Sequence, residues 1–200
     1  MDTTTVIVIA VVVLLLVLLL AAVLAPRLRQ RRRSQALQNR LGPEYDRAVD
    51  ASGDRSTAEE HLERRVERRE QLDIRPLEPT ARQRYADEWR ETQKRFVDAP
   101  GEAVHEADSL VTRVMRDRGY PVDDFERRVD DVSVDHPGVV DDYRAAHRVA
   151  IAHDRGEAGT EDLRQALVHY RSLFDRLLSD GNGAAPSAAT GRHDHPQEAP

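Results

Sequence analysis

The sequence predicts an all-α protein, with an N-terminal transmembrane helix followed by a compact bundle of five or six helices. Three observations support this fold class. Residues 6–25 carry no polar side chain, apolar residues recur at helical spacing between residues 44 and 180, and no stretch alternates long enough for a strand. The chain of 200 residues therefore divides into four parts. They are the transmembrane helix at 1–25, an arginine-rich juxtamembrane segment at 26–43, an acidic helical domain at 44–180 and a disordered tail at 181–200.

The predicted transmembrane helix is the run Val6–Ala25, which contains only Val, Leu, Ile and Ala. Twenty helical residues at about 1.5 Å each cover about 30 Å, the thickness of the hydrocarbon core of a bilayer. A cleaved signal peptide is disfavoured because residues 1–5 contain no Lys or Arg and Pro26 follows the only small-residue cleavage pattern. A buried core helix is disfavoured because nothing later in the chain is apolar enough to surround it.

Five arginines follow the apolar run directly: Arg27, Arg29, Arg31, Arg32 and Arg33. Only Asp2 and the amino terminus flank the other end, so the positive-inside rule places residues 26–200 in the cytoplasm. The chain is then a single-pass protein of the cell membrane, with the lipid bilayer as its first partner. The arginines set topology, and they can also bind anionic lipid head groups, at about 1 kcal/mol each near a charged leaflet. The sequence does not separate these two roles.

Composition excludes several classes of protein. The chain has no cysteine, which rules out a disulfide scaffold and a cysteine-based zinc site. Residues 44–180 hold 33 acids and 23 bases, a balance that repels phosphates and argues against nucleic acid as a partner. No glycine-rich phosphate loop, nucleophile elbow or familiar Ser/His/Asp spacing is present. We therefore assign no catalytic, cofactor-binding or metal-binding residues and no cofactor, and an enzyme is the less expected class.

The helical domain opens with two short helices. Gly42-Pro43 starts the first, which runs from residue 44 to about 51 because proline suits the first helical position. Ser56 and Glu59 have the spacing of a capping box and start the second helix, which reaches about Leu72. This second helix is mostly charged and has a thin apolar stripe, so we expect it at the edge of the bundle.

The remaining helices are predicted from their apolar stripes and their end signals. They cover about 80–96, 100–118, 123–132, 137–156 and 160–178. Thr80 with Gln83 has capping-box spacing at the start of the first of these, and Gly119 suits a left-handed C-cap at the end of the second. Asp123 and Glu126 are predicted to cap the start of the third. Trp89, the only tryptophan, falls within an apolar stripe, so we expect it in the core with its indole N–H reaching the surface or a partner.

One candidate for metal chemistry is the pair Glu102 and His105, an E-x-x-H on a helix. Carboxylate-bridged di-iron bundles use two such pairs and two further glutamates. Only one such pair is recognised here. The simpler interpretation is two exposed residues in a first helical turn, where glutamate suits the helix dipole.

The dipeptide His153-Asp154 is a second candidate. Some all-helical metal phosphohydrolases bind metal through an upstream His, a His-Asp dyad and a distant Asp, for which His105 or His136 and Asp175 are available. The simpler interpretation is that His153 complements the dipole at the end of its helix. A membrane-anchored metal-dependent hydrolase using His153 and Asp154 therefore stays open as an alternative function.

Acid pairs and tail histidines complete the candidates. The pairs are Asp123-Asp124, Asp130-Asp131 and Asp141-Asp142, and the tail carries His193 and His195. Adjacent carboxylates on a helix diverge by about 100°, so one pair does not converge on a metal, and acids in first turns act as caps. Metal binding by the tail would be weakened by the entropy of ordering it.

Five motifs carry a resemblance: Leu41-Gly-Pro-Glu-Tyr-Asp46, Asp73-Ile-Arg-Pro-Leu77, Ala81-Arg-Gln-Arg-Tyr85, Arg118-Gly-Tyr-Pro121 and Val134-Asp-His-Pro137. Through them residues 41–178 resemble a group of uncharacterised single-pass membrane proteins of actinobacterial type. Those proteins are similar in having an N-terminal membrane helix, an arginine-rich junction and a charged helical domain. The group has no assigned activity, so the resemblance implies the architecture and no site residues.

These observations lead to a functional hypothesis and two rivals. We expect a membrane-anchored helical interaction or scaffold module on the cytoplasmic face, with an unidentified protein partner, because tethering concentrates the domain near other membrane-bound proteins. The first rival is the metal-dependent hydrolase. The second is an envelope protein whose helical domain lies outside the cell.

Overall fold

The computed structural model describes residues 14, 20 and 31–179. These residues are helical or lie in turns and loops, and no strand occurs among them, which confirms the all-α prediction. Val6–Ala25 lies outside the described residues except for Leu14 and Leu20, both helical and more than half exposed. Arg27, Arg29 and the tail also lie outside. Within the described part, no helix combines the length and the apolar character that a bilayer span requires.

Helices α2 to α8 appear close to their predicted places. They are α2 (Pro43–Ser52), α3 (Arg55–Glu70), α4 (Pro79–Arg95), α5 (Pro100–Arg118), α6 (Phe125–Asp135), α7 (Val140–Asp154) and α8 (Thr160–Ser179). Residues 31–41 are also helical and lead into α2. The predicted left-handed C-cap at Gly119 is confirmed by its φ of 98°.

The N-caps differ from the sequence prediction in three helices. The carboxylate of Asp54, not the hydroxyl of Ser56, caps α3 by accepting a hydrogen bond from the backbone N–H of Thr57 at 2.8 Å. Asp124, not Asp123, caps α6 in the same way. The capping box predicted at Thr80 is wrong, because α4 already begins at Pro79, whose ring favours the first helical position.

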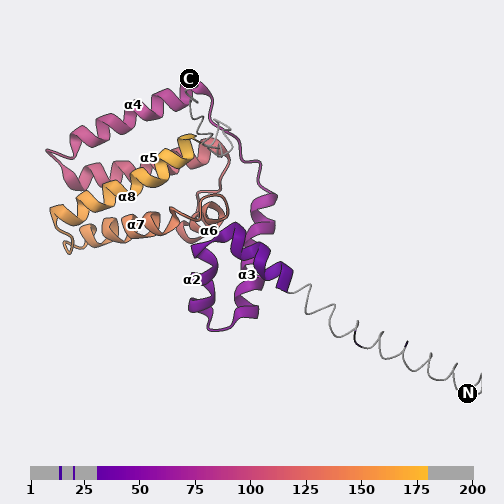
Figure 1. Ribbon diagram of the computed structural model, residues 1–200. Helices are drawn as coiled ribbons and strands as arrows, with labels where there is room; N and C mark the ends of the chain where they lie inside the picture. The colour runs from indigo at the N-terminus through magenta and orange to yellow at the C-terminus, as the bar shows by residue number, and fades with distance from the viewer. Residues whose placement is uncertain (1–13, 15–19, 21–30, 180–200) are drawn as a thin grey trace, which may run out of the picture.

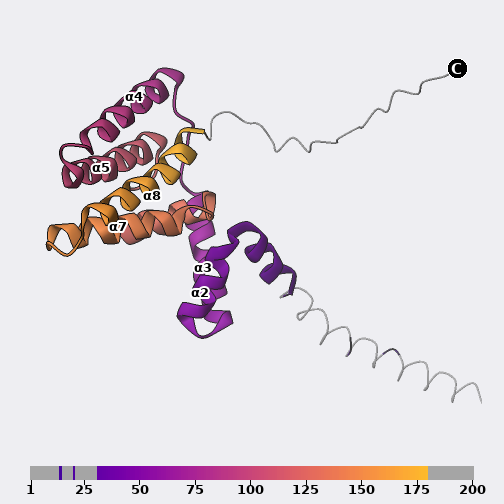
Figure 2. The same cartoon turned by 60° about the vertical axis from the view of Figure 1, so that its left-hand side comes forward.

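Most helices pack around one main core (Figure 1). The antiparallel pair α7 and α8 packs on α5, and α4 covers the other side of α5 (Figures 1 and 2). Trp89 of α4 is buried and stacks on Phe174 of α8 with ring centroids 4.6 Å apart. Its core position is as predicted, but its indole N–H is buried and has no hydrogen-bond partner in the described part of the chain.

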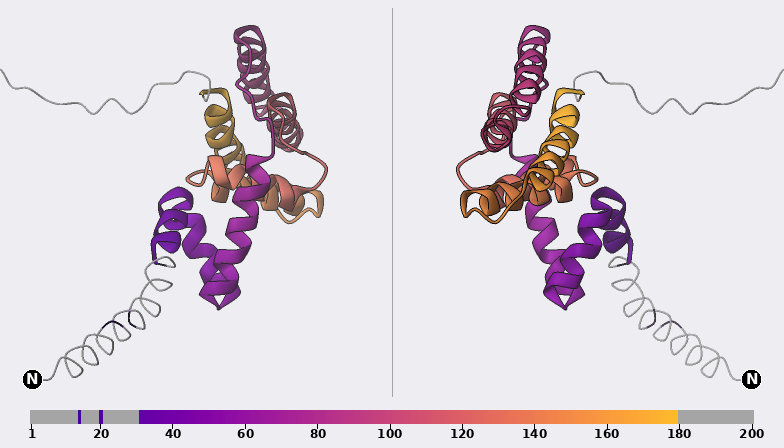
Figure 3. Two further views of the ribbon diagram at one scale, coloured as in Figure 1. Left: turned by 90° about the vertical axis from the view of Figure 1, so that its right-hand side faces the viewer. Right: turned by 90° about the vertical axis from the view of Figure 1, so that its left-hand side faces the viewer.

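A second, smaller core joins the N-terminal helices. Leu37, Leu41, Tyr45 and Leu62 pack together with Val134 of α6. We call residues 31–70 the N-terminal module and α4–α8 the main bundle. Figure 3 shows α2 and α3 as a hairpin projecting to one side of the main bundle. The expectation of a single bundle of five or six helices is therefore too simple: the thin apolar stripes of α2 and α3 close a core of their own.

Residues 71–78, which we call the link, connect the two parts and are held against the main bundle. The backbone N–H of Arg75 donates to the carbonyl of Arg118 at 2.8 Å, and the Arg118 side chain donates to the carbonyl of Leu177 at 2.9 Å. Gly119 allows close approach of this link, because a Cβ atom there would lie 2.5 Å from the carbonyl oxygen of Asp73. From Asp73 onward the link therefore follows a fixed path to α4.

Candidate functional site

The structure describes three of the five arginines that follow the apolar run, and all three are exposed. Arg31, Arg32 and Arg33 lie on the first turns of helix 31–41 and face solvent. Leu37 and Leu41, later on the same helix, are buried in the core of the N-terminal module. The helical segment that carries these arginines is therefore packed directly into the folded domain.

The structure brings together part of the predicted His-Asp site. Nε2 of His105 lies 2.9 Å from Oδ1 of Asp154, and the rings of His105 and His153 are 6.1 Å apart between centroids. Gly101 makes room for this arrangement, because a Cβ atom there would lie 2.0 Å from Nε2 of His153. The contact joins the beginning of α5 to the end of α7.

The other residues of that predicted site lie elsewhere. His136 precedes α7 and His153 lies near its end, so the 15 residues of α7 separate them by about 22 Å. Asp175 lies near the far end of α8, away from the turn that joins α7 to α8. Glu102 is exposed. Within the described residues, no group of three or more His, Asp or Glu side chains is placed to hold a metal ion.

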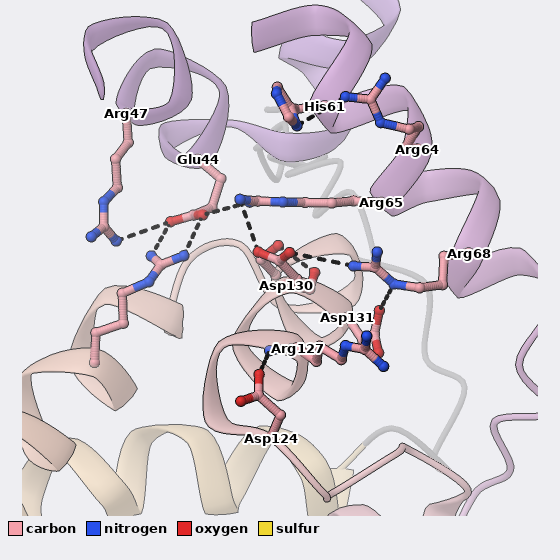
Figure 4. A network of polar contacts seen from close by, with 12 residues as sticks. Glu44, Arg47, His61, Arg64, Arg65, Arg68, Asp124, Arg127, Asp130 and Asp131 are labelled. Atoms are coloured by element: carbon pink, nitrogen blue, oxygen red, sulfur yellow. Dashed lines mark hydrogen bonds and ion pairs between the residues drawn. The ribbon is translucent and has the colours of Figure 1, made fainter. Parts of the chain in front are cut away.

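The acid pairs instead serve the contact between the N-terminal module and the main bundle. Figure 4 shows arginines of α3 extending toward acids of α6. Asp130 and Asp131 lie on α6, and Asp141 lies in the first turn of α7. Asp142 points to a different partner, His169, at 3.0 Å. Apart from the cap Asp124 and the exposed Asp123, these acids therefore take part in ion pairs.

Glu44 and Asp131 are the two most deeply buried charges of this contact, and Glu44 has the more elaborate surroundings. The side chain of Glu44 is 2% exposed, and both of its carboxylate oxygens accept hydrogen bonds from Arg144 of α7, at 2.5 and 2.8 Å. Arg65 and Arg47 approach the same carboxylate at 3.7 and 3.8 Å. Such a bidentate arginine–carboxylate pair is among the stronger and more directional polar contacts in proteins.

The arginines of α3 extend this contact along α6. Arg65 lies 2.8 Å from Asp130, so it connects Asp130 to Glu44. Arg68 donates from Nε to Asp131 at 2.9 Å and lies 3.3 Å from Asp130. Burial raises the pKa of Asp130, while Arg65 and Arg68 act in the opposite direction. The hydrogen bond to Asp131 is the main cause of the raised pKa of Arg68.

A third arginine of α3 completes the set. Arg69 donates to Asp135 at 2.5 Å, and the hydroxyl of Tyr120 donates to the same carboxylate at 2.5 Å. Burial, followed by this hydrogen bond, raises the pKa of Tyr120, so the phenol is the donor at neutral pH. Arg47 and Asp141 close the exposed edge at 2.6 Å. We call this set of ion pairs the ionic contact.

Sequence reasoning did not find the ionic contact. Glu44 and Arg144 are 100 residues apart, and no sequence pattern connects them. One signal was available: Arg68 and Arg69 lie three and four residues after Arg65, which places them on the same face of a helix as Arg65. Two of their partners, Asp130 and Asp131, form an acid pair that the sequence suggested only as candidate metal ligands, and the third, Asp135, belongs to no such pair.

A buried polar cluster lies inside the main bundle. His147 of α7 stacks on Phe125 with centroids 3.6 Å apart, and its Nδ1 lies 4.0 Å from Oδ1 of Asp108 of α5. The hydroxyls of Tyr143 and Tyr170 are buried and have no hydrogen-bond partner in the described part. Burial is the main cause that lowers the pKa of His147 and raises those of both tyrosines. The cluster therefore favours a neutral imidazole.

The surface of α4 and α5 contains an open groove of about 530 Å³. Its lining residues are Thr80, Gln83, Arg84, Asp87, Glu88, Glu91 and Glu106. Four of these seven residues are acids and one is a base. Each of these acids already forms an ion pair within the chain: Asp87 with Arg90, Glu88 with Arg113, Glu91 with Lys94 and Glu106 with Arg95. A positively charged group binds there only by exchange with these bases.

Comparisons with protein-family models, curated proteins and solved structures find no match to this chain. The resemblance to the membrane-protein group therefore stays a prediction.

Proposed function

We propose that the protein is a single-pass, membrane-anchored interaction module whose helical domain stands at the cytoplasmic face. The observation that carries the proposal is helix 31–41, which has exposed arginines at its start and buried leucines at its end. Arg31 and Leu41 are ten residues apart, or about 15 Å along a helix. A basic surface suited to anionic head groups is thus attached to the folded domain without a flexible spacer.

The exposed leucines before this helix support a lipid neighbour. Leu14 and Leu20 are helical and 58% and 59% exposed. They belong to the twenty-residue run without polar side chains, for which lipid is the favourable solvent.

We place the partner-binding face at the α4–α5 groove. Its acids, Asp87, Glu88, Glu91 and Glu106, would exchange their ion-pair partners within the chain for Lys or Arg side chains of a protein partner. A tether raises the effective concentration of this face toward other membrane-bound chains, so weak charged contacts suffice for association.

Two measurements test the anchor and its orientation. Sodium carbonate washing of membranes should leave the full chain in the pellet. A reporter enzyme that works only in the cytoplasm should be active when it is fused after residue 180, and one that works only outside the cell should be inactive there. Release by carbonate would contradict the anchor, and a reporter active only outside would favour the envelope-protein alternative.

Crosslinking in cells tests the partner face. We expect a crosslinked partner with the native chain and its loss with the double variant Asp87→Lys/Glu91→Lys. The matched control is Glu157→Lys, an exposed acid in the turn between α7 and α8. A partner that survives the groove variant but is lost with the control would contradict this placement.

One observation favours the hydrolase as a second candidate, namely the approach of His105 to Asp154 and His153. A hydrolase of this kind would need a bound metal. Metal analysis of the purified full chain tests it. Stoichiometric metal that is lost in His153→Ala would favour the hydrolase, and a native chain without stoichiometric metal would remove it.

A further inference from the structure

The N-terminal module and the main bundle are joined mainly by ion pairs, whereas each of the two cores is held together by apolar side chains. On the side of the main bundle, Val134 is the buried apolar side chain that joins the core of the N-terminal module. The other contributions described above are ion pairs, from Glu44–Arg144 at one end to Arg69–Asp135 at the other. Separating these surfaces would expose little apolar area, and it would return the charges to water, which relieves their desolvation.

The two parts carry unlike net charges. Residues 31–70 contain ten arginines and nine acids, a net of +1, whereas residues 71–179 contain 17 bases and 23 acids, a net of −6. An anionic lipid surface attracts the arginines of the first part and repels the second. The field of such a surface therefore acts to pull the two apart.

The arginine face of α3 lies close to the basic start of the module. Arg40 of helix 31–41 forms an ion pair with Glu70 at the end of α3, at 2.7 Å. This contact places the second half of α3, with Arg65, Arg68 and Arg69, beside the helix that begins at Arg31. Nine residues of helix separate Arg31 from Arg40, about 14 Å. Head groups that reach Arg31 are therefore near enough to compete for the arginines of α3.

A hinge for separation is also present. Helix α3 ends at Glu70, and the link is fixed to the main bundle again at Arg75. Gln71 and Leu72 lie between these two points, in a turn. A change of backbone conformation there moves the N-terminal module and leaves the main core intact.

We propose that the ionic contact is a latch that anionic lipid opens. Lipid head groups replace Asp130, Asp131 and Asp135 as partners of Arg65, Arg68 and Arg69, and the N-terminal module turns away from the main bundle as a unit. This inference rests on the proposed membrane location. It adds that the composition of the bilayer controls the shape of the domain.

Distance measurements between two spin labels test the latch. The chain has no cysteine, so Ser56→Cys and Glu157→Cys, both at exposed positions, provide unique labelling sites on the N-terminal module and the main bundle. The labelled full chain is placed in nanodiscs of phosphatidylcholine or of phosphatidylcholine with phosphatidylglycerol. We expect one distance in the neutral discs and a second, longer distance in most molecules in the anionic discs.

A pair of matched variants separates the latch from general effects of lipid. Asp130→Asn/Asp135→Asn removes two acids of the contact and leaves the arginines that bind lipid, so the longer distance should already appear in neutral discs. The control Asp123→Asn/Glu126→Gln removes two exposed acids from the same region and should behave like the native chain. Circular dichroism checks that both variants keep the native helix content, and a loss of helix in Asp130→Asn/Asp135→Asn in place of a longer distance counts against separation as a unit.

Salt gives an independent measurement in detergent. Raising NaCl from 0.1 to 1 M shortens the Debye length from about 10 to about 3 Å and should shift molecules toward the longer distance. A single unchanged distance in anionic discs overturns the latch while leaving the anchor in place. A chain that does not enter nanodiscs at all overturns the proposed function, and the latch with it.

Discussion

At the scale of single residues, the protein buries an ion pair of opposite charges. Glu44 and Arg144 are both nearly inaccessible to water, with side chains 2% and 11% exposed. A buried ion pair adds little stability over an apolar pair of the same size, but removal of one partner leaves an uncompensated charge. The consequence of a substitution here therefore depends on whether one partner or both are changed.

Arg144→Ala should reduce the free energy of unfolding by about 3 kcal/mol, since Arg65 and Arg47 compensate Glu44 only from a longer distance. The double variant Glu44→Met/Arg144→Met should lose clearly less. Urea unfolding followed by circular dichroism measures both, with the exposed Arg155→Ala as control. A double variant that is less stable than Arg144→Ala would contradict the ion-pair interpretation.

His147 gives a dependence of stability on pH. Burial, helped by Arg128 and opposed by Asp108, holds its pKa below the ordinary value of 6.5. The unfolded chain then binds a proton at a higher pH than the folded chain, so stability is lost as the pH falls from about 6.5 through the lower folded pKa. His147→Gln should remove this loss, as shown by unfolding free energies at pH 7.5 and 5.5. The exposed His61→Gln should leave it unchanged.

At the scale of helices, the residues at the helix ends determine where each helix begins and stops. The sequence predicts Ser56 as the cap of α3, but the structure has Asp54 in this role, and its carboxylate also accepts a hydrogen bond from the hydroxyl of Thr57 at 2.6 Å. Asp54→Ala should therefore cost about 1 kcal/mol, and Ser56→Ala much less. Thermal unfolding of the two variants decides, and equal losses would contradict the assigned cap.

The close approach at Gly119 provides a second test of a helix end. Its φ is 98°, and a Cβ atom would lie 2.5 Å from the carbonyl oxygen of Asp73, so Gly119→Ala should cost about 1–3 kcal/mol. Gly138→Ala is the matched control, because nothing lies within 4 Å of its added Cβ. Chemical denaturation measures both variants. A small loss at Gly119 would mean that the link moves aside easily.

The extent to which sequence predicts these elements follows from the range of the interactions. Apolar periodicity and Pro or Gly at the ends are local signals, and they located α2 to α8 within a few residues. The division into two cores depends on Val134 meeting Leu37 and Leu62, a contact between distant segments. The ionic contact depends likewise on partners such as Arg68 and Asp131, 63 residues apart. Local patterns contain no information on such pairings.

At the scale of the whole molecule, two cores of unequal size imply unequal stability. Trp89, the only tryptophan, lies in the main bundle, whereas circular dichroism reports on all helices. In 1 M salt, which weakens the ionic contact, the two signals should follow different urea transitions, with part of the helix signal lost first. In low salt they should lie closer together. Coincident transitions in 1 M salt would show that the two parts unfold as one.

Helix 31–41 has a mechanical consequence. Leu37 and Leu41 are four residues apart, on one side of a rod that is stiff against twisting, and both are enclosed by neighbouring side chains. Any torque applied to the chain at Arg31 must therefore rotate the helices that enclose Leu37 and Leu41 as well.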